Sequence, residues 1–331
     1  MNRRELLKIT GFASMSAILS PTLMSFTKTN KKSVIAIPPG FIQFQMGDLE
    51  LLILTDGYVP MKNLQPVFAP DVKTEDVNTK TSKMFEKTEN VEISINIMLI
   101  KKQEQLILID VGSGPHFGET EGWLPQSLHE AGISNSEITD IFITHAHRDH
   151  IGGILDKESK LIFLNAKYHI SPKEFNFWTA EKPDFSKSKL SNYPETGVSF
   201  TKNILQKIKD KLYFYEHGEL LFDCLKPELA EGHTPGHTIF SVFSKEKIVT
   251  HIVDTVHNQL LIEKPEWGIQ WDVDFKKGIQ TRIEILGKVS KNNELVISTH
   301  LPWPGIGHII NTDNGFKWKP LAYSTPRKIT I

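Results

Sequence analysis

Short apolar runs separated by polar segments recur along this chain of 331 residues, and such runs are typical of β-strands. Phe41–Gly47 and Leu51–Thr55 predict one hairpin, and Glu92–Lys101 with Gln105–Asp110 predict another. Between them, Pro60–Asn90 is polar and rich in Lys, Thr and Glu, so we expect a long loop or a weak helix there. The first part of the fold is therefore expected to be built from hairpins.

Helices join the strands in the rest of the chain. We expect strands near 138–144, 161–164, 167–170, 212–231, 238–244, 247–254, 294–299, 307–311 and 315–319, and helices at Leu124–Ala131, Ser171–Thr179, Phe200–Lys211 and Asp274–Lys291. In the last helix Asp274 is the expected N-cap, and the expected apolar face is formed by Ile279, Ile283, Leu286 and Val289. Hairpins mixed with βα units predict an α/β fold, a four-layer αβ/βα sandwich in which two mixed sheets are flanked by helices.

The first residues have a different pattern. Arg3 and Arg4 precede a short apolar stretch from Ile9 to about Leu19, and Ser20-Pro21 follows. A basic start and a short apolar core are typical of an export signal, and the stretch is too short to span a membrane. The arginine pair resembles a twin-arginine signal, with an ordinary secretory signal or a helical extension of the fold as alternatives. We expect residues 1–28 to be the signal, residues 29–331 to be one domain, and the protein to be periplasmic.

Composition argues against several classes of function. The formal net charge is −1 and no Lys/Arg-rich run is interleaved with aromatic residues, so a nucleic-acid partner is not expected. Cys224 is the single cysteine, which rules out an intrachain disulfide and a site of several thiolates, and we expect it to be a small buried apolar residue. The sequence holds no G-x-S-x-G, which argues against a nucleophilic serine enzyme.

Three histidines and an aspartate are concentrated in the segment Thr144–His150, directly after the apolar run Ile141–Ile143. Imidazole and carboxylate are the side chains that best bind a borderline-soft divalent metal. His145 and His147 are two residues apart, so they point the same way on extended backbone, whereas Asp149 and His150 must diverge from that line. This segment therefore predicts ligands for two adjacent metal ions, and the alternative is a polar loop with chance histidines.

Further residues of the same kind end other apolar runs. Glu231–Thr238 contains His233 and His237 between two predicted strands, while Asp254 and His300 each follow a strand. Sheets of α/β proteins place their sites at such strand ends, so we expect these side chains to meet. Taken alone, Asp254 would be a turn residue and His300 a loop histidine.

The motif order H-x-H-x-D-H, G-H-T-P-G-H-T, strand-end Asp and strand-end His resembles the metallo-β-lactamase superfamily of hydrolases over nearly all of residues 40–320. The resemblance implies one metal on His145, His147 and His233, a second on Asp149, His150 and His300, and Asp254 bridging both. It further implies that His237 lies behind the ligands and that Asp110 orients one of them. Asp110 is otherwise a turn residue before a glycine.

The implied chemistry is hydrolysis by a hydroxide that two divalent ions share and keep deprotonated at neutral pH. Zinc is the expected metal, although the same side chains accept Mn, Fe, Co or Ni. Asp254 as the bridge and Asp149 as the group that passes a proton to the leaving group are the expected catalytic residues. A redox di-iron centre is less expected, because superfamily members of that kind carry an acid at the position of His147.

Several segments bear on the substrate. Pro265–Trp267, Trp271–Asp274, His300–His308 and Gly315–Trp318 resemble the branch that holds exported N-acyl-homoserine lactone lactonases and methyl parathion hydrolase. This predicts a quorum-quenching lactonase, with an organophosphate triester hydrolase or a non-catalytic metal-binding protein as alternatives. The partner is then a small lactone or ester, and the family tends toward homodimers. We expect an apolar pocket wall formed by Phe68, Phe175, Trp178 and Trp303.

Overall fold

The apolar runs become the strands of two facing sheets in the computed structural model, which describes residues 40–190, 194–313, 315–323 and 329–331. The first sheet has the order β14-β1-β2-β3-β4-β5-β6-β7 and the second the order β13-β12-β11-β10-β9-β8. The strands are β1 (Phe41–Met46), β2 (Leu49–Asn63), β3 (Glu89–Lys102), β4 (Gln105–Ile109), β5 (Asp140–Ile143), β6 (Lys167–Ile170), β7 (Leu212–Phe214), β8 (Leu225–Leu229), β9 (Thr238–Ser244), β10 (Lys247–His251), β11 (Leu295–Ile297), β12 (Ile306–Thr312), β13 (Gly315–Pro320) and β14 (Ile329–Thr330).

Both sheets are mixed. Strands β1 to β4 pair antiparallel as consecutive hairpins, and β4 to β7 continue the first sheet in parallel. In the second sheet β10 and β11 are parallel while the remaining pairs are antiparallel. The metal-ligand motifs predicted above lie in the connections that leave β5, β8, β10 and β11. The connections after β5 and β10 are crossovers, which parallel neighbours need, and those after β8 and β11 join antiparallel neighbours.

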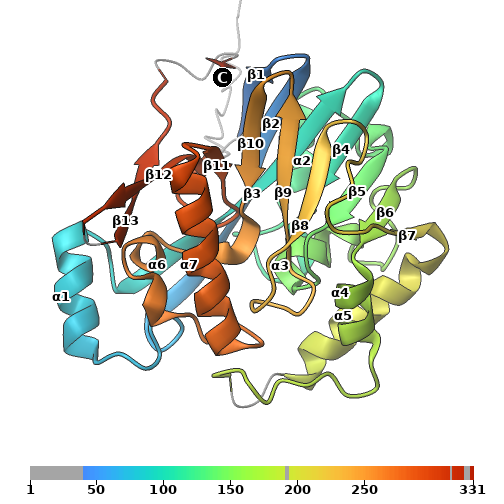
Figure 1. Ribbon diagram of the computed structural model, residues 1–331. Coiled ribbons are helices and arrows are strands. Elements are labelled where there is room, and N and C mark those ends of the chain that lie inside the picture. The colour runs from blue at the N-terminus through green and yellow to red at the C-terminus, as the bar shows by residue number, and fades with distance from the viewer. Residues whose placement is uncertain (1–39, 191–193, 314, 324–328) are drawn as a thin grey trace, which may run out of the picture. The chain divides into compact units, whose positions relative to one another are not determined.

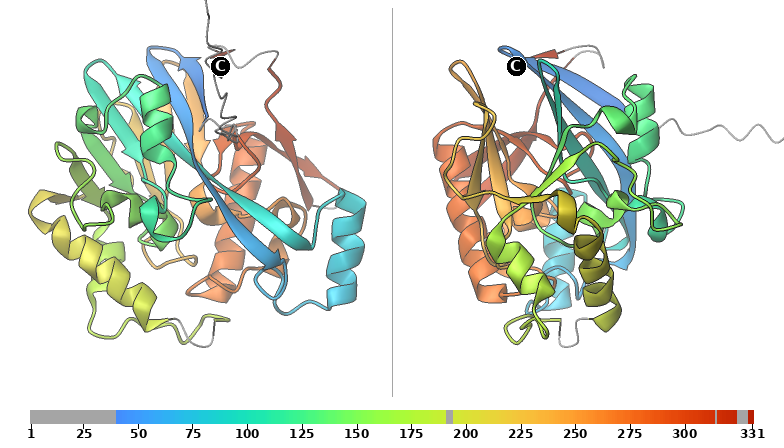
Figure 2. Two further views of the ribbon diagram at one scale, coloured as in Figure 1. Left: turned by 180° about the vertical axis from the view of Figure 1, so that it is seen from behind. Right: turned by 90° about the vertical axis from the view of Figure 1, so that its right-hand side faces the viewer.

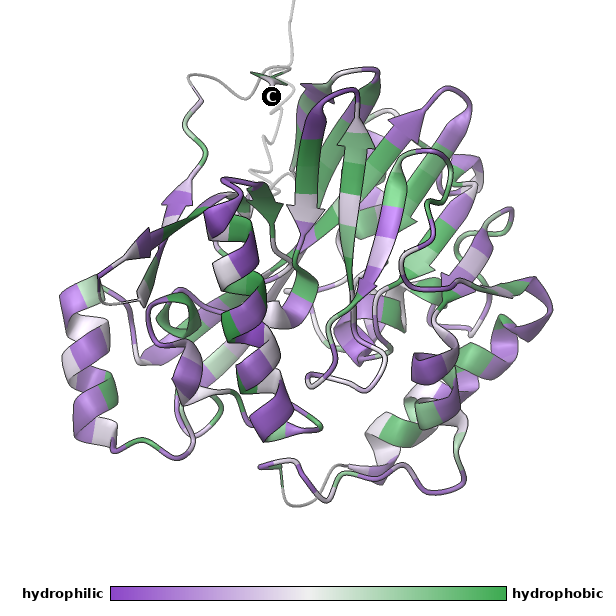
Figure 3. Ribbon diagram, viewed as in Figure 1, coloured by the Kyte–Doolittle hydropathy of each residue, from purple (hydrophilic) through white to green (hydrophobic). Residues whose placement is uncertain are grey.

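Alternate residues of the strands face different layers, because side chains of a strand point to opposite sides in turn. In β2, Leu51 and Ile53 belong to the core between the two sheets, whereas Leu52 and Leu54 belong to the core under the helices of the first sheet. Figure 2 shows the two sheets face to face with helices on the outer sides, and Figure 3 shows the hydrophobic residues gathered in the strands. The predicted four-layer α/β sandwich is confirmed.

The helices cover the two outer faces. Helices α2 (Leu124–Glu130), α4 (Pro172–Thr179) and α5 (Glu195–Lys207) pack against the first sheet. Helices α6 (Leu260–Glu263) and α7 (Phe275–Lys291) pack against the second, and α1 (Thr74–Met84) contributes Val77 to the same core. The four-residue α3 (Arg148–Ile151) follows β5 (Figure 1). Among the described residues, no helix is both long enough and apolar enough to cross a bilayer.

Helix α7 buries Leu286 and Val289 as predicted, but not the whole of its predicted apolar face. Asp274 caps the helix as expected and accepts a hydrogen bond from the Lys277 backbone N–H at 3.0 Å. Ile283, however, is 41% exposed, so its predicted place on the buried face is wrong. The buried face is centred near Arg282, whose guanidinium donates to the carbonyls of Thr255 and Pro265. These bonds allow a cation to lie where hydrophobic periodicity alone would place an isoleucine.

Some element boundaries also differ. Residues 60–90 hold the end of β2, the helix α1 and the start of β3, so the predicted helix is present there and the alternative of one long loop is wrong. Helix α5 begins at Glu195, before the predicted Phe200. The predicted strand 161–164 is absent from the described structure, where Leu161 makes an isolated bridge to Leu155. Cys224 is buried, as expected. The predicted export signal lies outside the described residues.

Candidate metal centre

Four connections bring the predicted ligands together at one edge of the two sheets. His145, His147, Asp149 and His150 follow β5, His233 lies between β8 and β9, Asp254 follows β10, and His300 follows β11 (Figure 1). All of them are buried except Asp149, whose side chain is 20% exposed. Strand ends that meet at one edge place these distant residues side by side, as the sequence predicted.

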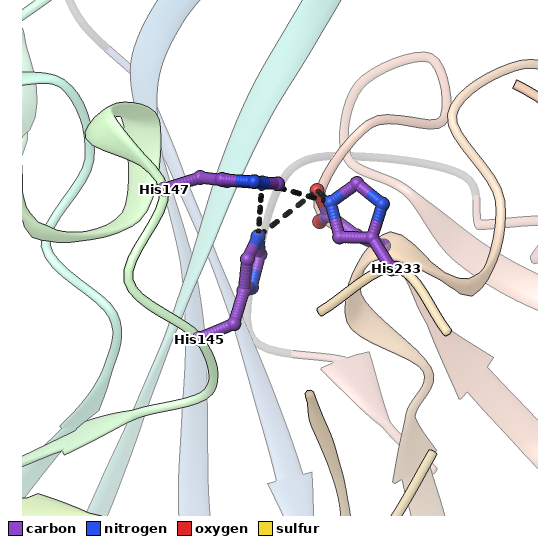
Figure 4. Close-up of side chains that lie close together, drawn as sticks. His145, His147 and His233 are labelled. Atoms are coloured by element: carbon purple, nitrogen blue, oxygen red, sulfur yellow. Dashed lines mark hydrogen bonds and ion pairs between the residues drawn. The ribbon is translucent and has the colours of Figure 1, made fainter. Parts of the chain in front are cut away.

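Three imidazoles converge on one point. Nδ1 of His147 lies 3.0 Å from Nε2 of His145 and 2.9 Å from Nε2 of His233. Figure 4 shows the three rings turned toward one another from two separate loops. Burial holds the pKa of His145 and His147 well below its ordinary value, which keeps these rings neutral and a nitrogen lone pair available. Neutral imidazole is the form that binds a metal. Burial would lower the pKa of His233 as well, but Asp254 and Asp272 raise it to about 9, so this ring would lose a proton on binding a metal.

One carboxylate oxygen lies among the imidazoles. Oδ2 of Asp254 is 3.6 Å from Nε2 of His145 and 3.3 Å from Nε2 of His233. It is also 3.2 Å from Nε2 of both His150 and His300. Burial alone would raise the pKa of Asp254, but the surrounding imidazoles hold it well below the usual value. Asp254 is therefore an anion placed between the two predicted ligand groups.

The second group is formed by Asp149, His150 and His300. Oδ2 of Asp149 lies 3.5 Å from Nε2 of His300 and 3.9 Å from Nε2 of His150. Nearby imidazoles lower the pKa of Asp149 although burial would raise it, so this carboxylate is ionised. The group thus offers two nitrogens and one anionic oxygen beside Asp254.

The donor sets fit divalent metal ions. The ligand atoms of His145, His147, His233 and Asp254 lie within 4.8 Å of one another, and so do those of Asp149, His150 and His300. Nitrogen ligands of one tetrahedral zinc ion, bound at about 2.0–2.1 Å, lie roughly 3.3 Å apart. Nε2 of His150 and Oδ1 of Asp254 are buried and make no hydrogen bond to any described residue. Two adjacent cations would satisfy both atoms.

Asp110 holds the loop after β5 in place. Its Oδ2 lies 2.8 Å from Nδ1 of His150 and accepts the Thr144 hydroxyl at 2.7 Å, while its Oδ1 accepts the Thr144 backbone N–H at 2.9 Å. That hydroxyl is in turn 3.0 Å from Nδ1 of His145. Asp110 has a left-handed backbone with φ +63°, a conformation that costs free energy outside glycine and is often found at functional sites. Its predicted role of orienting a ligand agrees with these contacts.

Other ligands are oriented through the nitrogen that faces away from the centre. Nδ1 of His300 lies 2.8 Å from the carbonyl of Ser94 on β3. His237, predicted to lie behind the ligands, accepts the Asp254 backbone N–H at 3.3 Å through Nε2, and its Nδ1 lies 2.9 Å from the Ala230 carbonyl. Burial lowers the pKa of His237 to about 3, so this ring is neutral.

Three residues of the site were not predicted from the sequence. Asp272 contacts Nδ1 of His233, Glu174 binds the loops that carry three of the histidines, and His257 places Nε2 3.1 Å from Oδ2 of Asp254. Glu174 is a single acid without a local motif, and Asp272 lies in the segment Trp271–Asp274, which was read for the substrate branch and not for the metal site. His257 carries a signal that could have been read, because it is an imidazole three residues after the predicted bridging aspartate.

A pocket of about 470 Å³ opens onto the metal centre. His147, Asp149, His233, Asp254, His257 and His300 form its polar end. Its other walls are mostly apolar or aromatic and include Val59, Ile93, Phe117, Leu190, Phe200 and Trp271. Arg148 also lines the pocket, with its guanidinium 4.2 Å from the centre of the Phe117 ring. The pocket thus pairs a charged end with an apolar arm.

The four aromatic residues predicted to form the pocket wall do not line it. Phe68 is fully buried behind the wall, with its ring 6.2 Å from that of Trp271. Phe175 packs against Phe214, and Trp178 is held in the core by a hydrogen bond to Glu174. Trp303 is 40% exposed and lines a separate depression. Aromatic residues look alike in a sequence whether they fill a core or line a cavity.

Comparison with known proteins agrees with this geometry. The model of the metallo-beta-lactamase superfamily matches residues 91–300. The structure of AidC, a dizinc quorum-quenching lactonase in complex with its product N-hexanoyl-L-homoserine, is 37% identical in sequence with a TM-score of 0.83, and the match covers 87% of this chain and 99% of AidC. The hydrolase AbOPH of the beta-lactamase superfamily is 30% identical with a TM-score of 0.77, covering 87% of this chain and 99% of AbOPH.

A more distant likeness concerns the fold alone. A probable metal-dependent hydrolase from Staphylococcus aureus is 20% identical with a TM-score of 0.66, and the match covers 85% of this chain and all of that one. A search of curated protein sequences found no match. The family match, the two similar hydrolases and the buried His/Asp centre agree: the chain belongs to the metallo-β-lactamase superfamily and is a metal-dependent hydrolase.

Proposed function

We propose that this protein is a dinuclear metal-dependent lactonase that opens N-acyl-homoserine lactones. The observation that carries the proposal is the joining of two adjacent His/Asp ligand groups to an apolar pocket in one cavity. The similarity to AidC, a dizinc quorum-quenching lactonase, supports the same substrate class. Hydrolysis of such lactones would quench signalling by acyl-lactones.

The proposed ligands are His145, His147 and His233 for one metal and Asp149, His150 and His300 for the other, with Asp254 shared. Zinc is the proposed metal, because tetrahedral sites of imidazole and carboxylate suit it well. Bound divalent metals supply a water molecule that is deprotonated at neutral pH and polarise the carbonyl to be attacked. Since the pocket reaches these ligands, the site is open, unlike a closed structural metal site.

The chain's own residues position the substrate and move the proton. The carboxylate of Asp149 lines the pocket and is ionised, so its second oxygen, the one that would not bind a metal, can take the proton that the attacking water loses and pass it to the oxygen that leaves when the ring opens. Phe117, Phe200 and Leu190 form apolar walls that exclude water and can receive an acyl chain. A volume of about 470 Å³ is in the usual range for a pocket that takes a small molecule.

Organophosphate triester hydrolysis is a second candidate function. The observation in its favour is the aromatic character of the pocket, in which Phe117, Phe200 and Trp271 could stack on an aryl leaving group. The same ligand groups would serve both reactions, so the choice between them depends on the shape of the pocket.

We further propose that residues 1–28 are an export signal of the twin-arginine type and that the mature protein, residues 29–331, is one domain located in the periplasm. The supporting observation is the arginine pair before a short apolar stretch. A homodimer is compatible with this proposal. Expression of the full chain in a host whose twin-arginine pathway has been deleted tests it, because the signal would then remain uncleaved in the cytoplasm.

The test of the function is a side-by-side assay of the purified protein on a long-chain N-acyl-homoserine lactone and on a paraoxon-type triester. We expect fast lactone opening that a chelator abolishes, that added zinc restores, and that the Asp254→Ala variant lacks. Strong triester turnover with negligible lactone opening would move the function to the second candidate. Activity on neither substrate by protein that still binds two metals would contradict both.

A further inference from the structure

Glu174 is a buried carboxylate that accepts four hydrogen bonds. Its side chain comes from the first turn of α4 and is fully buried. Oε1 accepts the Ala146 backbone N–H at 2.8 Å and the Trp178 indole N–H at 2.6 Å. Oε2 accepts the Thr234 hydroxyl at 2.6 Å and the Gly236 backbone N–H at 2.9 Å. All four donors are neutral, so Glu174 is not one half of a salt bridge with them.

Three of these donors belong to the loops that carry the three-imidazole group. Ala146 lies between His145 and His147, and Thr234 directly follows His233. Glu174 thus connects the loop after β5 to the loop between β8 and β9 through one side chain. The distance between these loops is the quantity that determines whether the three imidazole nitrogens can share a metal.

Close backbone packing supports the same connection. A Cβ atom on Gly236 would lie 2.3 Å from the backbone nitrogen of Glu174, so this approach requires glycine. The hydroxyl of Ser171, the N-cap of α4, donates to the Gly236 carbonyl at 3.2 Å. On the other loop, the Thr201 hydroxyl of α5 donates to the Ala146 carbonyl at 3.0 Å. The loop between β8 and β9 is therefore packed tightly against the start of α4, and the loop after β5 is bound to both α4 and α5.

The four donors require a carboxylate. An ionised carboxylate has two oxygens with about four lone-pair sites, whereas a glutamine amide keeps one oxygen and turns two N–H donors toward its neighbours. Glutamine at position 174 would therefore place donor against donor for one pair of the four contacts. A buried donor left without its acceptor is unfavourable, and a small shift of the loop would relieve it.

We propose that Glu174 is a positioning residue that sets the spacing between His145, His147 and His233 and thereby determines metal affinity at this three-imidazole group. The inference rests on the proposed dinuclear site, but it does not depend on which substrate is hydrolysed. The group of Asp149, His150 and His300 is held by other contacts, those of His150 with Asp110 and of His300 with Ser94. Its metal affinity should therefore depend less on Glu174.

The test is metal binding by the Glu174→Gln variant of the full-length protein, measured by competition between metal-free protein and a chelating dye for zinc. The matched control is Glu231→Gln, the same change two residues before His233, at a side chain that pairs with Lys173 on the surface. We expect two binding steps in the wild type and the control, and a loss of roughly 10- to 100-fold in affinity for one step in Glu174→Gln. Equal weakening of both steps, or no weakening, would overturn the proposal.

Melting temperatures measured with and without zinc distinguish a general loss of fold stability from a positioning role of Glu174. We expect zinc to raise the melting temperature of Glu174→Gln by less than that of the wild type, whereas a purely structural role would lower both curves equally. Thr234→Val removes one donor to Oε2 without changing Glu174, and we expect a smaller loss of affinity at the same step. Because none of these readouts uses a lactone, failure of the substrate proposal would leave them unchanged.

Discussion

Nε2 of His257 lies 3.1 Å from Oδ2 of Asp254. The Nε2 atoms of the four predicted ligands around this oxygen are slightly farther from it, at 3.2–3.6 Å, namely those of His145, His150, His233 and His300. His257 lines the pocket, and its ring stacks on that of His300 with the planes 13° apart. A buried imidazole at this distance can donate a hydrogen bond to the carboxylate that the two metals would share. A hydrogen bond to a charged group contributes about 1.5–3 kcal/mol.

Replacing His257 by alanine is therefore expected to lower kcat/KM for lactone opening by roughly 10- to 100-fold. His308→Ala is the control, because that imidazole is half-buried and lies against the Glu294 carbonyl, outside the pocket lining. Steady-state kinetics on both variants, with metal content measured in parallel, checks the expectation. Equal activities of the two variants would show that the contact with Asp254 has no part in the reaction.

The link between His233 and the core runs through Asp272. Oδ1 of Asp272 lies 2.9 Å from Nδ1 of His233, and its Oδ2 lies 3.2 Å from Nη2 of the buried Arg282. Asp272→Asn leaves this guanidinium without its counter-charge, and breaking a buried pair in this way costs about 3–5 kcal/mol. Chemical denaturation should show that loss in the free energy of unfolding. Asp71→Asn, which breaks an exposed pair with Lys189, should cost at most about 1 kcal/mol.

The stability of the fold should depend on pH through Asp56. Burial raises the pKa of this carboxyl to about 7, although the backbone N–H groups of Leu124, Ser113 and Gly122 oppose the rise. The folded state therefore holds a proton that the unfolded chain releases near pH 4. The stabilising contribution of protonated Asp56 is present in full below that pH and is lost as pH rises toward 7.

Urea unfolding at pH 5, 6 and 7 tests this dependence. Relative to Asp56→Asn, which cannot titrate, the wild type should lose about 1.3 kcal/mol more between pH 5 and 6 and about 1 kcal/mol more between pH 6 and 7, because the folded carboxyl begins to ionise near pH 7. Parallel curves for the two proteins would place the pKa of Asp56 near its ordinary value in the fold.

The apolar arm of the pocket should select the acyl chain. Phe200 lines this arm with Phe117, and their ring centres are 5.4 Å apart. Phe200→Ala widens the arm, so we expect kcat/KM for a twelve-carbon acyl lactone to fall about tenfold relative to that for a four-carbon one, the equivalent of about 1.4 kcal/mol of lost apolar contact. Phe175→Ala, at an aromatic residue outside the pocket, should leave this ratio unchanged. A constant ratio in Phe200→Ala would mean that the acyl chain lies elsewhere.

The metal ligands could be predicted from the sequence because their chemistry restricts the residue types. Few combinations of His and Asp at strand ends arise without a shared role, and the structure brings His145, His147, Asp149, His150, His233, Asp254 and His300 to one edge. The family was predicted from the same motifs and the four-layer fold from the pattern of hairpins and βα units, and both are confirmed.

The surroundings of the ligands could not be predicted in the same way. Glu174 and Asp272 are isolated acids whose partners are distant in the sequence, and only the fold brings those partners near. The pocket wall was misassigned because Phe68 and Phe200 have the same apolar character, and burial in a core differs from lining a cavity only in three dimensions. Arg282 shows the converse case, in which specific hydrogen bonds bury a cation where periodicity predicts an apolar face.

The most direct test of the central claim is a zinc titration of metal-free protein, with the initial rate of N-acyl-homoserine lactone opening followed at each addition. If the two ligand groups form one dinuclear centre, the rate should stay low through the first equivalent and rise with the second, and Asp254→Ala should show no rise. Full activity after one equivalent, or none after two are bound, would contradict the account of this protein as a dinuclear lactonase.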